Sequence, residues 1–226
     1  MPQPGVIPAL ARVVRGLSAL FWGLPFALLI NTKTALGDPW QSWGLLPGLF
    51  TTGLLGYGTY ELRKFQPGER IWISALERAQ VLGLMVFALT PSAQWWNRVP
   101  EEPFFFGGIL LLLAAGLTFL LSLNQVLLRL AAMLPDETLR TETRFFVRWN
   151  SRLILALGVL LTAYFVLVRM PSLPPAIVPL VMVFDLVKTW LILLLALVPV
   201  ALTMTLLWKT KEVILAGVFG ADLNRP

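Results

Sequence analysis

Residues 107–123 read GGILLLLAAGLTFLLSL, a run without a single charged side chain. An α-helix rises about 1.5 Å per residue, so this run nearly crosses the ~30 Å hydrocarbon core of a bilayer. Its apolar residues are continuous and do not alternate with polar ones, which argues against a strand of an outer-membrane β-barrel. The run therefore predicts a transmembrane helix.

The composition of the whole chain agrees with that prediction. Of its 226 residues, 57% are hydrophobic and 13% are charged, and the mean hydropathy is +0.76. Ordinary soluble domains have about 25% charged residues. The sequence thus favours an all-α, polytopic integral membrane protein that forms one transmembrane domain over residues 1–226.

Apolar runs of similar length recur along the chain and predict about six transmembrane helices. An even number of spans places both termini on one side of the membrane. The expected spans are residues 13–31, 43–61, 72–91, 104–124, 151–168 and 186–208.

The distribution of basic residues predicts which side that is. With these spans, fourteen of the eighteen lysines and arginines fall on the side of the two termini. Positive charge concentrates in cytoplasmic loops, so both termini are expected in the cytoplasm. Most of the nine tryptophans fall near predicted span ends, where their amphipathic rings are favoured. We expect a bacterial cytoplasmic (inner) membrane or an equivalent internal membrane.

Glu77 and Arg78 are adjacent charges at the beginning of an apolar stretch. Glu77 lies seven residues after Arg70, or about 10 Å along a helix, which is too shallow for the bilayer centre. The pattern favours a polar face in the headgroup region. A functional or inter-subunit ion pair is the alternative.

Small residues recur at every fourth position of the second expected span, at Gly44, Gly48, Thr52 and Gly56. Such a stripe lets two membrane helices approach closely. It predicts a helix-packing interface, either with another helix of this chain or with a partner subunit.

Four arginines follow one another at the same spacing: Arg140, Arg144, Arg148 and Arg152. On a helix they form one slowly drifting basic stripe. We expect residues 132–150 to form a cytoplasmic amphipathic helix whose stripe docks on anionic lipid or on a partner protein. An ordinary positive-inside signal on a solvated helix is the alternative.

Residues 170–185 are apolar and rich in proline, and they are expected on the outer side of the membrane. They could form an outer cap, a re-entrant turn or the beginning of a tilted helix. Asp185 and Lys188 follow, one helical turn apart, and are a possible ion pair.

Residues suited to catalysis are scarce. The chain has no cysteine and no histidine, and its twelve acidic residues are scattered. No metal-ligand spacing, phosphate-binding glycine loop or nucleophile motif is present, so we predict neither an enzyme nor a metal site. No cofactor is predicted, although the residues do not exclude a bound pigment or quinone. No basic domain exists for nucleic acid.

These features favour a non-catalytic multi-pass membrane subunit. Its expected partners are membrane lipid and other membrane proteins or further copies of itself, and its role would be structural, in assembly, or in holding lipid or pigment. A transporter or channel for a lipid or apolar small molecule is the alternative, because the expected span centres lack charge. An intramembrane enzyme is the least favoured reading.

Overall fold

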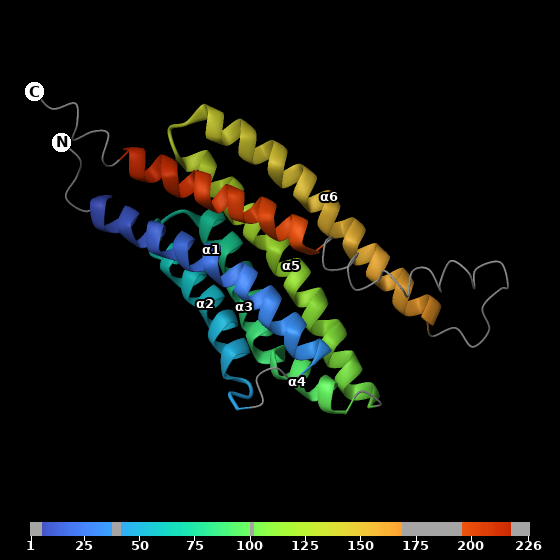
Figure 1. Cartoon of the computed structure of the whole chain (residues 1–226). Coiled ribbons are helices and arrows are strands. Elements are labelled where there is room, and N and C mark those ends of the chain that lie inside the picture. Colours follow the sequence, from blue (N-terminus) through green and yellow to red (C-terminus); the bar gives the residue numbers. More distant parts are fainter. Residues whose placement is uncertain (1–5, 38–41, 100–101, 169–195, 218–226) are drawn as a thin grey trace, which may run out of the picture.

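The computed structural model describes residues 6–37, 42–99, 102–168 and 196–217, and these residues contain helices and turns without any strand (Figure 1). The labelled helices are α1 (Val6–Leu36), α2 (Leu46–Arg63), α3 (Arg70–Leu89), α4 (Pro91–Arg98), α5 (Pro103–Met133) and α6 (Glu137–Val168). Residues 196–217 form a further helix, called helix 196–217 below. The all-helical prediction is confirmed for the described residues.

Four stretches of the described chain are long and apolar enough to cross a membrane: Pro8–Ala35, Arg70–Arg98, Pro103–Met133 and Glu137–Ala163. They suggest an integral membrane protein. Helix α2 is not among them. Its 18 residues include Tyr57, Tyr60, Glu61 and Arg63, which lower its apolar character. The second expected span is therefore helical, but its helix is less apolar than the four stretches above.

Helices α1 and α2 pack closely because glycines lie at their contact. A Cβ atom on Gly58 would lie 2.6 Å from Leu20 Cγ and 2.9 Å from the carbonyl oxygen of Gly16. A Cβ on Gly16 would in turn lie 2.8 Å from the carbonyl oxygen of Gly58. Neither position has room for a side chain, so the two backbones lie against each other as in small-residue membrane helix pairs.

The connections bring the basic segments of the chain to one end of the bundle. At this end α1 begins, α2 is followed by α3, α5 is followed by α6, and helix 196–217 ends (Figure 1). We call it the basic end, because Arg12, Arg63, Arg70, Arg140 and Lys209 belong to it. Helix α4 and the beginning of α5 lie at the opposite end (Figure 1).

Helices α5 and α6 are joined by a short turn over residues 134–136. The Asp136 carboxylate accepts a 3.0 Å hydrogen bond from the Leu139 amide and so caps the first turn of α6. Helix α6 then continues unbroken through 32 residues. Of the expected amphipathic helix over 132–150, residues 132–133 end α5 and 134–136 form the turn. Residues 137–150 share one helix with the expected span 151–168, and no turn separates residues 150 and 151.

The reason for this continuity lies in the residues of the junction. Neither proline nor glycine occurs between Glu137 and Leu157, so nothing interrupts the backbone hydrogen bonds of the helix. Helix α5 has 31 residues and α6 has 32, or about 46–48 Å each at 1.5 Å per residue. Both exceed the ~30 Å hydrocarbon core, so in a membrane their joined ends project beyond it.

The glycine contact between α1 and α2 generates a test with a matched control. We expect Gly58→Ala to destabilise the folded protein by about 1–3 kcal/mol, because the added methyl group forces Leu20 and the Gly16 carbonyl apart. Gly56→Ala should be neutral or slightly stabilising, because its Cβ would meet nothing within 4 Å. The free energy of unfolding is measured in detergent by denaturant titration. Equal stability of the two variants contradicts the packing described here.

Candidate functional site

A buried polar cluster connects three helices. It consists of Asn124 on α5, Asn150 on α6 and Thr203 on helix 196–217, and all three residues are fully buried. Asn150 Nδ2 donates to Thr203 Oγ1 at 2.9 Å and to the Pro199 carbonyl oxygen at 3.1 Å. Thr203 Oγ1 lies 3.2 Å from Asn124 Oδ1 and 2.8 Å from the Pro199 carbonyl.

The cluster is not fully satisfied. A hydroxyl has one proton, so Thr203 donates to Asn124 or to Pro199 but not to both at once. Asn124 Nδ2 and Asn150 Oδ1 are enclosed and have no hydrogen-bond partner among the described residues. The Pro199 carbonyl oxygen, one turn before Thr203, lies within hydrogen-bond distance of both Asn150 and Thr203. The cluster fixes how helix 196–217 sits against α5 and α6.

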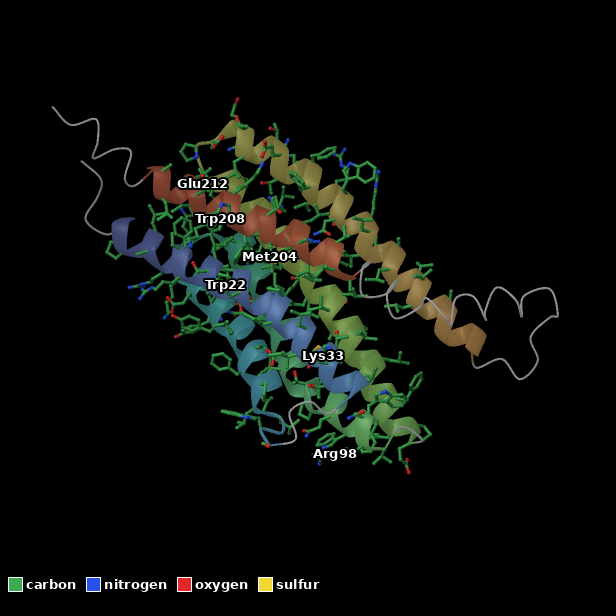
Figure 2. All side chains as sticks on the ribbon, viewed as in Figure 1. Trp22, Lys33, Arg98, Met204, Trp208 and Glu212 are labelled. Carbon is green, nitrogen blue, oxygen red and sulfur yellow. The ribbon has the colours of Figure 1, made fainter. Side chains whose placement is uncertain are left out.

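Two further contacts hold helix 196–217 in place. Lys209 Nζ donates to Glu142 Oε2 on α6 at 2.6 Å, and both side chains are about 40% exposed. On the other flank, the Trp208 ring lies 5.8 Å from the Phe21 ring of α1. Figure 2 shows Met204 and Trp208 on this helix, with Trp22 labelled on the neighbouring α1. Helix 196–217 therefore contacts α1, α5 and α6.

Glu77 and Arg78 bond to different partners. Glu77 accepts a 3.1 Å bond from Arg63 Nη2 on α2, with side chains 52% and 47% exposed. Arg78 Nη2 lies 3.4 Å from Ser74 Oγ. An exposed pair of this kind contributes about 0–1 kcal/mol. Nearby, the hydrogen bond from Lys64 Nζ to Glu61 raises the pKa of Lys64. Asp185 and Lys188 lie outside the described residues, as do residues 170–185.

The small-residue stripe of α2 divides into two parts. A Cβ on Gly48 would lie 2.7 Å from Thr90 Cγ2, and the hydroxyls of Thr52 and Thr90 lie 3.4 Å apart. Gly44 is not part of the helix, contrary to the prediction from the stripe, but lies in the turn before α2 with a φ of +55°. A Cβ on Gly44 or on Gly56 would meet nothing within 4 Å. Two of the four positions thus contact the residue that follows α3 in the same chain, and the closest approach in α2 is instead at Gly58.

The arginine stripe lies on α6 as one face, and its members differ in their surroundings. Arg140 Nη2 donates to the Ala132 carbonyl oxygen at 2.9 Å, across the turn from α5. Arg140 and Arg144 line a hollow with Leu128, Arg129 and Ala132 of α5. Arg148 is exposed, and Arg152 lies 5.8 Å from the exposed ring of Trp149.

Sequence reasoning missed Asn150 and Thr203 of the polar cluster. Asn150 lies in the basic, aromatic stretch before the fifth expected span, where a polar residue is not unusual. The signal was its spacing: the buried residues of α6 are separated by three or four positions, and Asn150 occupies one of them. They are Leu139, Thr143, Val147, Asn150, Ile154, Leu157 and Leu161.

The described residues contain no group of three or more acidic side chains placed to hold a metal ion. The groups that do cluster are amides, hydroxyls and guanidinium groups, which join helices and bind anions. No family model, no curated protein and no solved structure matches this chain. The proposals below therefore rest on its own residues.

The polar cluster can be tested by a double-mutant cycle. We expect Asn150→Ala and Thr203→Val each to destabilise the protein, and the double variant to lose less than the sum of the two. The coupling free energy should be about 0.6–1.7 kcal/mol, the size measured for hydrogen bonds between membrane helices. Unfolding of the four proteins in detergent gives the value. Strictly additive losses contradict a bond between the two side chains.

Proposed function

We propose that this chain is a non-catalytic multi-pass subunit of a larger membrane assembly, with a structural or assembly role. The observation that supports it best is the distribution of polar and apolar groups. Inside the described bundle, amides and hydroxyls bond to one another and to nearby carbonyls, as Asn150 and Thr203 do. Outside, large apolar side chains are exposed, such as Phe50 at 74% and Leu84 at 67%.

Exposed aromatic rings add a surface suited to a protein partner. Trp22 and Phe26 stack on α1 with ring centroids 6.1 Å apart, and both are about half exposed. Aromatic side chains offer a large contact area at a low cost in conformational entropy. In a membrane assembly they would pack against helices of another subunit.

We further propose six spans with both termini in the cytoplasm of a bacterial cell. In this topology α2 and residues 186–208 would supply the two spans beyond the four that length and composition support. Gathering of the basic residues at one end of the bundle favours this orientation, because such residues remain on the cytoplasmic side.

Transport of a lipid or another apolar molecule is the second candidate. An open groove of about 560 Å³ lies between α5 and α6, and Leu117, Leu121, Leu155 and Val159 are among the residues that line it. The groove has the size of a small-molecule site, but charged side chains do not line it. It favours an apolar substrate over an ion.

The subunit proposal predicts a defined complex. After mild detergent extraction from native membranes, native mass spectrometry should show this chain together with other polypeptides in fixed stoichiometry. The chain would owe this association to exposed aromatic rings such as those of Trp22 and Phe26, which offer a large contact area to helices of another subunit. If known complexes in the same extract survive but this chain is recovered as a lone monomer, the subunit proposal is contradicted and transport is favoured.

The topology can be mapped with introduced cysteines, because the chain contains none. Gly68→Cys lies in the turn between α2 and α3, and Gly37→Cys follows α1, and neither Cβ would meet another atom within 4 Å. In intact cells an impermeant maleimide should label the Gly37→Cys variant and also Ser172→Cys, which lies in the expected outer segment. Position 68 should react only after permeabilisation. The reverse pattern overturns the orientation, and protection at 172 overturns the six-span count.

A further inference from the structure

Three arginines surround one small hollow at the turn between α5 and α6. The hollow has a volume of about 180 Å³ and is lined by Leu128, Arg129 and Ala132 of α5 with Arg140 and Arg144 of α6. Guanidinium groups are planar forks of N–H donors that match phosphate oxygens. Converging positive charges of this kind favour an anionic occupant.

These charges are not neutralised within the described part of the chain. Arg129 and Arg144 are exposed and make no ion pair there, and the Nε–H of Arg140 is enclosed without a hydrogen-bond partner. The nearby carboxylates are engaged elsewhere, since Asp136 accepts the Leu139 amide and Glu142 accepts Lys209. Within the described residues these guanidinium groups are therefore available to an anion from outside the chain.

A separate apolar groove lies farther along the same two helices. It is lined by residues of α5 (Ala114, Leu117, Thr118, Leu121) and α6 (Ile154, Leu155, Gly158, Val159, Thr162, Ala163). The hydroxyls of Thr118 and Thr162 bond back to carbonyls one turn earlier, so the groove offers a hydrocarbon chain few free polar groups.

Helix geometry places the hollow and the groove on one face. Leu121 and Leu128 are seven residues apart on α5, and Arg144 and Leu155 are eleven apart on α6. These separations are close to two and three full turns, so each pair faces the same way. Arg144 and Leu155 are separated by about 16 Å along the axis, close to half of the ~30 Å hydrocarbon thickness. On α5 the groove begins closer to the hollow, because Leu121 lies about 12 Å along the axis from Arg129. An acyl chain whose phosphate lies among the arginines can therefore enter it.

We propose that the α5–α6 hairpin binds an anionic phospholipid, with the headgroup phosphate among Arg129, Arg140 and Arg144 and an acyl chain in the groove. A free phosphate shares the headgroup chemistry but leaves the groove without a role. This inference rests on the membrane location within the proposed function and not on the presence of partner subunits. A complex could therefore be found without this lipid site, and the site without a complex.

The test titrates phosphatidylglycerol and, separately, phosphatidylcholine onto the full chain in neutral detergent, with bound lipid counted by native mass spectrometry. We expect Arg144→Gln to weaken phosphatidylglycerol binding about fivefold. Arg152→Gln is the matched control, because Arg152 belongs to the same stripe but does not line the hollow. It should leave the affinity unchanged, and phosphatidylcholine should bind weakly to every protein.

The groove is tested by Gly158→Leu, whose new side chain would fill it. Its Cβ would lie 3.9 Å from Leu117 Cδ1, an ordinary contact, so folding should survive. We expect weaker binding of long-chain phosphatidylglycerol and unchanged binding of a short-chain form. Equal losses with Arg144→Gln and Arg152→Gln would reveal general surface attraction and overturn the site. Displacement of the lipid by inorganic phosphate would overturn the choice of a lipid occupant.

Discussion

Thr203 joins parts of the chain that are far apart in sequence, and the arrangement of the last described helix depends on it. Its hydroxyl meets Asn150 from α6, Asn124 from α5 and the Pro199 carbonyl one turn back. In an apolar surrounding, a polar side chain without a partner is expensive, so these groups find one another. Leucines pack equally well in many registers. A bond between an amide and a hydroxyl selects one.

The glycine contacts fix the other half of the bundle in a different way. Gly16 and Gly58 bring two backbones together without any polar side chain, and the stabilisation comes from dispersion over a close surface. Leucine side chains such as Leu20 and Leu62 then fill the space beside the contact. One half of the protein is thus specified by the shape of its contacts and the other by a few directional bonds.

Much of the helical architecture could be predicted from the sequence, because apolar runs such as 107–123 have few alternatives in a chain this hydrophobic. The boundaries of the helices were harder to predict. Hydropathy reports which residues prefer lipid, whereas a helix ends where its backbone hydrogen bonds are interrupted. Residues 137–150 looked like part of a separate element, yet they contain neither proline nor glycine, and α6 passes through them into the expected span that begins at Ser151.

The residues of the candidate site could likewise be predicted only in part. The stripe of Arg140, Arg144, Arg148 and Arg152 was evident from its spacing. Its partner Arg129 was not, because the hollow exists only once the turn after Met133 folds α6 back along α5. Asn150 was overlooked for a similar reason. A polar residue in a basic stretch reads as solvated until a helix from about fifty residues later covers it.

The order in which the helices are synthesised gives the polar cluster a second consequence. Asn124 and Asn150 emerge from the ribosome well before Thr203, so a nascent chain holds two amides that still lack the hydroxyl between them. Arrival of helix 196–217 covers them. A chain truncated before Pro199 would lack the hydroxyl and the carbonyl to which these amides bond, and polar side chains without partners are costly within a membrane.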